Sequence, residues 1–298
     1  MFDEPPCPAG WSLLPLDPAR NSSKIETEFC LWDDPAGALT VLRLGAKSFG
    51  RYRLCFNNEI TLDVMTDAKL IIEWPAKSGV HGATRNHVFA DQLYPRILAH
   101  EGNLVLHAGA FEAHGGCILI VGSSGRGKSS LVTSFDQAGF PLLGDDALVV
   151  SMPDGVAYAK AVYQSLRLFP DSVNALFKGG VGTSEVAHYT AKQRINIPVT
   201  ASPPTQPKPI LAMFMLLEPP AEDEVLVDRL SVANACMALV QSSFALDPSD
   251  AVHAVQRLEL ASALARQIPA FAISYPRNYA RLPAVREAIM DQCTRLKQ

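Results

Sequence analysis

The sequence has no excess of basic residues. Its 298 residues include 26 lysines and arginines and 30 aspartates and glutamates, which gives a formal net charge of −4. Proteins that bind the nucleic-acid backbone usually carry a basic surface that offsets the phosphate charge. The composition therefore argues against nucleic acid as a partner.

Closely spaced cysteines and long apolar runs are also absent. The six cysteines are scattered without a C-x-x-C pair, so neither a zinc site nor a disulfide framework is expected. The longest clear apolar run, residues 210–217, is much shorter than the roughly 20 residues that span a bilayer. The acidic, proline-rich start does not resemble a signal peptide. We therefore expect a cytoplasmic protein with no membrane partner.

The composition is typical of a globular protein, with 48% hydrophobic and 19% charged residues. Residues 1–20 are proline-rich and expected to be irregular. Short β-prone segments separated by polar turns then predict a β-rich N-terminal region over residues 1–86. The expected strands lie at residues 39–44, 51–56, 59–64 and 69–72.

The second region, residues 87–298, mixes strand and helix patterns and predicts an α/β domain. It begins with a helix at residues 87–101, bent near Pro95, and a hairpin joins the apolar segments 104–112 and 117–121. Residues 178–195 are expected to form a mobile loop and residues 201–209 a proline-rich linker. Further strands are expected at residues 141–143, 147–151, 210–217 and 271–275, and helices at 128–137, 231–243, 251–267 and 283–296.

The most informative motif is the glycine-rich run GSSGRGKS at residues 122–129. It fits G-x-x-x-x-G-K-[ST], the P-loop that binds the phosphates of a nucleoside triphosphate, expected here to be ATP. Its glycines permit a tight turn that directs backbone N–H groups at phosphate oxygens, and the following helix adds its positive dipole end. Lys128 should reach the β- and γ-phosphates, and Ser129 should bind Mg²⁺. The predicted nucleotide-binding residues are Gly122, Ser123, Ser124, Gly125, Arg126, Gly127, Lys128, Ser129 and Ser130.

Two acidic residues and one histidine lie near this loop in the sequence. Asp145 and Asp146 stand between apolar segments, where one carboxylate can face a metal ion and the other can accept a proton from an attacking hydroxyl. The residues alone do not show which aspartate has which role. His107 lies in an apolar segment, where a histidine is more often a packed core residue than a catalyst.

Three cations outside the loop could stabilise a transferring phosphoryl group. Arg167 is surrounded by apolar residues and needs an anionic partner if it is buried. Lys192 and Arg194 lie in the expected loop, where solvated basic side chains are the alternative interpretation.

These residues together resemble a known family. The runs LHAGA at residues 106–110, GSSGRGKS at 122–129 and LGDD at 143–146 are similar to the catalytic domain of HPr serine kinase/phosphorylase. That family belongs with the phosphoenolpyruvate carboxykinase-like P-loop proteins. A closer resemblance is to HPr-kinase-related proteins of bacterial peptide-modification clusters, including lasso-peptide kinases. It covers about residues 88–290 and includes LRLFPD at 166–171, KQR at 192–194 and YPRNY at 275–279.

The resemblance implies an α/β (α+β) fold in which an HPr kinase/phosphoenolpyruvate carboxykinase-like P-loop core follows a small β-rich region. It implies a kinase that transfers the γ-phosphoryl group of ATP, with Mg²⁺, to a serine-type hydroxyl of a peptide or small protein, including a ribosomal peptide natural product. By position, Asp145 would be the general base, Asp146 the metal-side carboxylate and His107 a catalytic residue. A homo-oligomer is compatible with the resemblance, because HPr kinases assemble as hexamers.

One part of the family pattern is missing. HPr kinases carry an ERGLGI-like segment after the aspartates that supplies a metal-side glutamate, and residues 151–175 contain no counterpart. The resemblance therefore does not extend to HPr as the acceptor.

Two other functions remain open at this stage. A nucleotide-binding regulatory or scaffold protein would bind ATP without phosphorylating an acceptor. A small-molecule kinase, acting on free serine or a similar metabolite, would have a pocket too closed for a peptide.

Overall fold

The chain forms two compact units in a computed structural model. The model describes residues 7–16, 28–33, 39–45, 50–57, 59–75, 80, 82–163, 165–196 and 206–296. Unit 1 comprises Met1–Glu101 and Ala245–Ala254, and unit 2 comprises Gly102–Phe244 and Val255–Gln298. Across the described ranges, no helix is both long enough and apolar enough to cross a bilayer.

Unit 1 is built on a six-stranded sheet with the order β1-β6-β5-β4-β3-β2. The four strands expected between residues 39 and 72 are present, each within one residue of its predicted ends. Residues 1–20 were expected to be irregular, but β1 lies there and pairs in parallel with β6; residues 1–6 and 17–20 lie outside the described residues. The strands are β1 Ser12–Pro15, β2 Glu28–Asp33, β3 Leu39–Leu44, β4 Arg51–Phe56, β5 Ile60–Met65 and β6 Leu70–Glu73.

A helical segment completes unit 1. It consists of α1 (Gly82–His87), a π-helical turn η1 (Val88–Leu93) and α2 (Tyr94–His100). Pro95 lies in the first turn of α2, and the widened π turn before it accommodates the missing N–H of the proline. The expected helix is present and begins five residues earlier than predicted, at Gly82.

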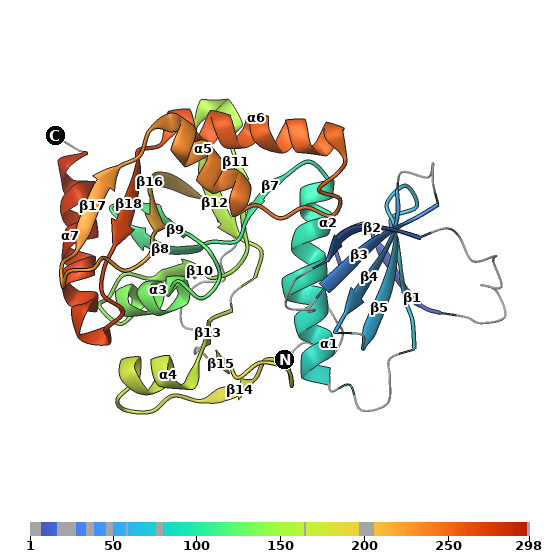
Figure 1. Ribbon diagram of the computed structural model, residues 1–298, viewed down its shortest axis with the longest axis horizontal. Helices are drawn as coiled ribbons and strands as arrows, with labels where there is room; N and C mark the ends of the chain where they lie inside the picture. Colours follow the sequence, from blue (N-terminus) through green and yellow to red (C-terminus); the bar gives the residue numbers. More distant parts are fainter. Residues whose placement is uncertain are drawn as a thin grey trace. The chain divides into compact units, whose positions relative to one another are not determined.

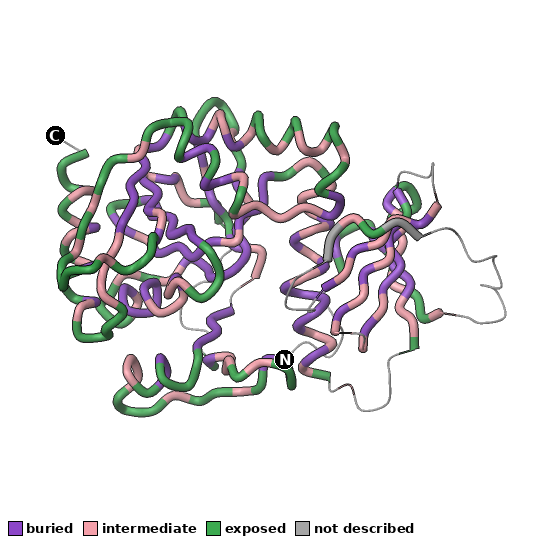
Figure 2. The backbone as a smooth tube through the Cα atoms, in the orientation of Figure 1, coloured by how far each residue is buried: buried purple, intermediate pink, exposed green. Residues whose placement is uncertain are grey.

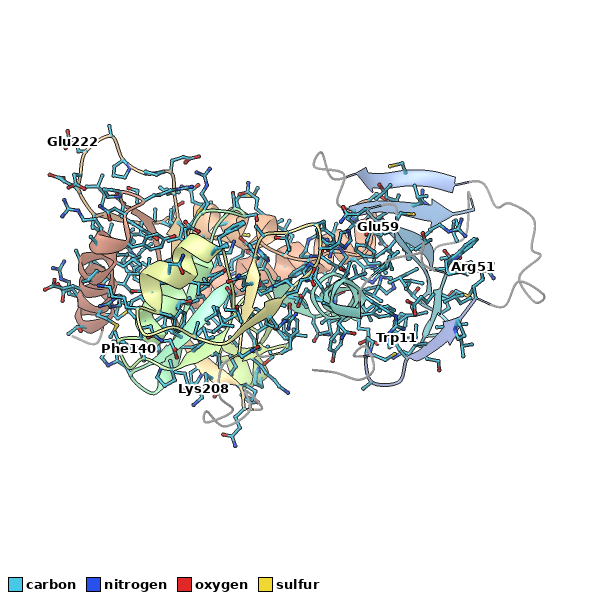
Figure 3. The ribbon with its side chains drawn as sticks, turned by 90° about the horizontal axis from the view of Figure 1, so that it is seen from below. Trp11, Arg51, Glu59, Phe140, Lys208 and Glu222 are labelled. Atoms are coloured by element: carbon cyan, nitrogen blue, oxygen red, sulfur yellow. The ribbon has the colours of Figure 1, made fainter. Side chains whose placement is uncertain are left out.

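The division of the chain differs from the expected boundary after residue 86. Phe89, Leu93 and Ile97 of the helical segment are buried in the same core as Tyr52 and Leu54 of the sheet. Trp11 closes this core, and its indole N–H donates to the Glu101 carboxylate at 2.9 Å (Figure 3). Because the helix shares the core of the sheet, it belongs to unit 1.

Unit 2 contains a nine-stranded mixed sheet. Its main order is β10-β8-β9-β16-β12-β11-β7, and β18 pairs with β16 and with β17. The central pairs β9–β16 and β16–β18 are parallel, and most of the others are antiparallel. The strands are β7 Leu104–Leu106, β8 Gly109–Ala113, β9 Gly116–Val121, β10 Leu142–Gly144, β11 Leu148–Ser151, β12 Tyr158–Ala161, β16 Lys208–Leu216, β17 Leu226–Arg229 and β18 Ala270–Ser274.

Helices cover both faces of this sheet (Figure 1). Along β9, Leu119 and Val121 share one core with α5 (Val232–Gln241) and α6 (Ala251–Gln267). The alternate residues Ile118 and Ile120 share a second core with α3 (Lys128–Asp136) and α7 (Leu282–Arg295). Because successive side chains of a strand point to opposite faces, a strand covered on both faces must be apolar throughout. Strand β9 is accordingly buried over its whole length, and its neighbour β16 is buried at five of its nine residues (Figure 2).

A small three-stranded sheet with the order β13-β15-β14 lies beside α4 (Pro170–Leu176) in unit 2. Its strands are β13 Arg167–Leu168, β14 Thr183–Glu185 and β15 Gln193–Ile195. The expectation of a mobile loop over residues 178–195 was therefore wrong in part, since β14 and β15 pair there. Of the expected linker at residues 201–209, residues 201–205 lie outside the described residues. The mixed α/β fold expected from the sequence is present.

The close contact of β9 with β16 leads to a first prediction. A Cβ at Gly116 would lie 2.5 Å from the Pro209 carbonyl oxygen and 2.7 Å from Leu211 Cγ, and backbone cannot easily move aside. Gly116→Ala should lower the free energy of unfolding by about 1–3 kcal/mol in urea titrations. The control is Gly179→Ala, since a Cβ there meets nothing within 4 Å. Equal effects from the two substitutions would contradict this packing.

Candidate functional site: a P-loop cavity with a buried aspartate pair

The glycine-rich run forms a strand–loop–helix. Strand β9 is buried up to Val121, and α3 begins at Lys128. Gly122, Gly125 and Gly127 have φ angles of 144°, 75° and 93°, a region that glycine adopts far more readily than other residues. The loop therefore has the backbone that the motif predicts, and its geometry depends on glycine at these positions.

The Lys128 side chain is buried against its own loop. Its ammonium donates to the carbonyl oxygens of Gly122 at 2.7 Å and Ser123 at 3.2 Å. Burial lowers the pKa of Lys128, and the charges of Asp146 and Asp145 act in the opposite direction. The carbonyls thus hold the lysine at the loop, next to the position where phosphates would bind.

Asp145 directly follows β10 and is fully buried. Among the described residues, neither of its carboxylate oxygens has a hydrogen-bond partner. Burial, with the charge of Asp146 added, raises the pKa of Asp145 to about 7, and the nearby Ser129 side chain acts to lower it. An unpartnered buried carboxylate near the P-loop serine fits a bound divalent cation, because both groups are hard oxygen ligands. Mg²⁺ is therefore compatible with these residues.

A metal site built from protein side chains alone was also sought. Within the ranges that the structure describes, no cluster of three or more His, Cys, Asp or Glu side chains could hold a metal. Mg²⁺ commonly takes one or two protein ligands and completes its shell with water and substrate phosphates.

Asp146 adopts the left-handed backbone conformation, with φ at 76°, and its side chain is tied to Arg167. The guanidinium donates through Nε at 2.9 Å and through Nη2, both to Oδ2. Burial acts to raise the pKa of Asp146, but Arg167, aided by His107 and Lys192, holds it well below its usual range. Asp146 is therefore a buried, ionised partner of Arg167, which answers the expectation that a buried Arg167 needs an anion.

His107 lies at a break between two strands. The expected hairpin is present as the antiparallel pair β8–β9, but the apolar segment 104–112 is divided, because β7 pairs with β11 while β8 pairs with β9 and β10. The backbone N–H of His107 donates to the Ser242 carbonyl at 2.6 Å, and the imidazole Nδ1 lies 3.8 Å from Asp146 Oδ1. Burial and the charge of Lys128 lower the pKa of His107 to about 4. A third of the side chain is exposed, so water screens part of this effect, but the imidazole is neutral at pH 7 either way.

A cavity of about 260 Å³ opens beside the loop. It is lined by seven consecutive P-loop residues, from Ser124 to Ser130, and by His107, Asp146, Arg167 and Lys192. Lys192 also lies 5.5 Å above the ring of Phe169, which lines the cavity as well. The structure thus brings His107, the P-loop, one aspartate and two of the three predicted clamp cations to one cavity.

Four of the predicted residues do not line this cavity. Gly122 and Ser123 contribute the carbonyls that hold Lys128. Asp145 lies outside the lining, and Arg194 pairs with Arg167 across the β13–β15 ladder. Arg194 therefore lies on the strand next to Arg167 and is not among the described residues that line the cavity.

The sequence did not identify a second group of lining residues. They come from the start of α4 and from the segment between β18 and α7. Ser172 Oγ lies 3.1 Å from Ser130 Oγ and 2.8 Å from the Tyr279 hydroxyl, which donates to Asp171 Oδ2 at 2.9 Å. The only signal for them was that LRLFPD and YPRNY belong to the family resemblance.

A further missed contact involves Arg126. Its guanidinium forms an ion pair with Glu218, in the segment that follows β16. Glu222 of the same segment is exposed and points outward from unit 2 (Figure 3). The Arg126 side chain thus contacts the segment after β16 and also lines the cavity.

The chain was compared with protein-family models, with curated proteins and with solved structures. No protein-family model matches the sequence, and no curated protein matches it. Among solved structures, the Hpr(Ser) kinase/phosphatase from Coxiella burnetii matches at 13% identity, covering 65% of this chain and 97% of that chain, with a TM-score of 0.34.

The raised pKa of Asp145 predicts a pH-dependent effect on stability. The folded protein retains a proton on Asp145 that the unfolded chain releases between about pH 4 and pH 7, so this group costs stability as the pH rises. Asp145→Asn should therefore be more stable than the parent at pH 8, by a few degrees in melting temperature. The difference should disappear near pH 3.5. A difference that is the same at all pH values would contradict the buried carboxylate.

Proposed function

We propose that the protein is an ATP-dependent kinase that transfers the γ-phosphoryl group to a serine-type hydroxyl of a peptide or small protein. The observation that carries the proposal is a P-loop whose Ser129 side chain lies near a buried carboxylate, Asp145, which has no hydrogen-bond partner among the described residues. A glycine-rich loop with only a structural role would not need a buried carboxylate beside it, because such a carboxylate without a hydrogen-bond partner destabilises the fold.

The P-loop would hold the phosphates of ATP. Its left-handed glycines aim backbone N–H groups inward, and the first turn of α3 adds unpaired N–H groups. Lys128 would exchange the carbonyls of Gly122 and Ser123 for the β- and γ-phosphates. The exchange replaces neutral acceptors with charged ones, which form stronger hydrogen bonds with an ammonium.

Ser129 and Asp145 would hold Mg²⁺, which when bound neutralises charge on the β- and γ-phosphate oxygens. Asp146 would face the acceptor, since it lines the cavity and Asp145 does not. The family resemblance implies the opposite division of these two roles, and the placement of the side chains favours this one.

The transfer itself would use the acceptor hydroxyl as nucleophile. Its oxygen forms a bond to the γ-phosphorus as the bond to the β–γ bridging oxygen breaks, and ADP leaves. The hydroxyl proton passes to Asp146 Oδ1, since Oδ2 already accepts from Arg167. Neutral His107, 3.8 Å from Oδ1, would help to orient the hydroxyl.

Arg167 and Lys192 would stabilise the charge of the transferring group, because both line the cavity next to the aspartate. Phe169 is 44% exposed beside them and offers an apolar contact for a peptide side chain. A kinase that uses ATP and Mg²⁺ on a peptide is consistent with a cytoplasmic location. The proposal of a homo-oligomer rests on the family resemblance alone.

The first test is phosphoryl transfer from γ-labelled ATP to a library of serine-containing peptides. Label should appear on peptides, and Lys128→Ala should lower the rate by about 100-fold or more, since it removes a preorganised charge. Lys160→Ala, an exposed lysine on β12, should leave the rate unchanged. Label on free serine alone would identify a small-molecule kinase. ATP binding without any labelled acceptor would indicate a regulatory protein and would contradict the proposal.

The division of labour within the aspartate pair predicts two different kinetic effects. Asp145→Asn should raise the Mg²⁺ concentration for half-maximal rate by about tenfold or more, as expected for loss of a metal-side carboxylate. Asp146→Asn should lower kcat by about 100-fold or more with little change in Mg²⁺ dependence. Asp154→Asn, in an exposed turn, serves as the control. If Asp146→Asn shifts the Mg²⁺ dependence and Asp145→Asn does not, the roles are reversed.

A further inference from the structure

The second group of cavity residues has no part in the transfer chemistry described above. It consists of residues at the start of α4 and between β18 and α7: Asp171, Ser172, Tyr275, Arg277, Asn278, Tyr279 and Leu282. We call Asp171, Ser172 and Tyr279, which are joined by hydrogen bonds, the tyrosine wall.

The tyrosine wall meets the P-loop at its C-terminal end. Ser172 contacts Ser130, the residue after the predicted Mg²⁺ ligand, at 3.1 Å. Tyr275, from the same segment as Tyr279, approaches the loop at Gly127, where a Cβ would lie 3.5 Å from its hydroxyl. The wall and the charged cluster of Asp146, Arg167 and Lys192 thus line the same cavity from different elements.

The direction of transfer places the nucleoside. The γ-phosphate must face the charged cluster, because the acceptor and its proton acceptor lie there. The α-phosphate and the nucleoside then extend away from that cluster. The described lining residues that are then left to contact the nucleoside are those of the group that contains the tyrosine wall.

The chemistry of the wall suits a nucleoside. The Tyr279 side chain is 36% exposed while its hydroxyl is anchored to Ser172 and Asp171, which holds an aromatic face in a fixed orientation. Aromatic faces stack on bases of any kind. Asp171 uses Oδ2 for Tyr279, and a carboxylate has further lone pairs that can accept from a ribose hydroxyl.

We propose that the tyrosine wall binds the nucleoside of ATP, with Tyr279 stacked on the base and Asp171 accepting from the ribose. This inference rests on the proposed function, since it takes the P-loop as the phosphate site. It makes Tyr279 a determinant of affinity for the nucleoside and leaves affinity for the phosphates to the loop.

The test compares ATP with inorganic tripolyphosphate, which carries the phosphates without a nucleoside, by calorimetric titration in the presence of Mg²⁺. The parent protein should bind ATP more tightly than tripolyphosphate. Tyr279→Ala should weaken ATP binding by about 5- to 100-fold and leave tripolyphosphate binding unchanged. Tyr279→Phe, which keeps the ring, should retain most of the ATP affinity. Tyr189→Ala, an exposed tyrosine outside the cavity lining, is the matched control and should change neither.

Three results would overturn the inference. Equal weakening of both ligands by Tyr279→Ala would mean that the ring only supports the P-loop. Equal affinity of the parent for ATP and tripolyphosphate would exclude a nucleoside site and leave the P-loop proposal intact. Failure of the parent to bind either ligand would overturn the proposed function together with this inference.

Discussion

The buried ion pair between Arg167 and Asp146 is the interaction on which the site depends. Both side chains are 7% exposed, and the two residues are 21 positions apart in the sequence. The pair connects the three-stranded sheet, through β13, to the loop that follows β10 of the large sheet. Removal of either partner would leave an uncompensated buried charge, which typically costs about 3–5 kcal/mol. The same contact therefore positions the cavity wall and keeps Asp146 ionised.

The site keeps several groups in arrangements that do not favour stability. Among the described residues Asp145 has no hydrogen-bond partner although it is buried, Asp146 has a left-handed backbone, and the Lys128 ammonium is held by carbonyl oxygens. Such features are retained where function requires them and the surrounding structure supports them. In unit 2 the support comes from the two apolar cores on either face of the sheet. Phosphates would give Lys128 anionic acceptors in place of the carbonyls, and a divalent cation would give Asp145 a counter-charge.

Local patterns in the sequence predicted much of the fold. The strands of unit 1 between residues 39 and 72 and the helices α3 and α6 lie where alternation and periodicity placed them. The prediction failed where long-range pairing decides the structure. His107 interrupts an apolar segment because β7 and β8 pair with different neighbours, and residues 178–195 become β14 and β15 only by pairing with each other and with β13. The helix at residues 82–100 belongs to unit 1 because of the core that it shares there, which no local pattern reports.

The sequence by itself determined the backbone of the glycine-rich loop, because the left-handed angles at Gly122, Gly125 and Gly127 depend on residue type and spacing alone. It also indicated the importance of Asp145, Asp146 and His107. Only the tertiary structure decided how these groups differ, since burial and neighbouring charge raise the pKa of one aspartate and lower that of the other. Only the tertiary structure brought Tyr279 to Ser172, 107 positions away. Contacts of this kind are made by packing between elements that are distant in sequence, and no short motif encodes them.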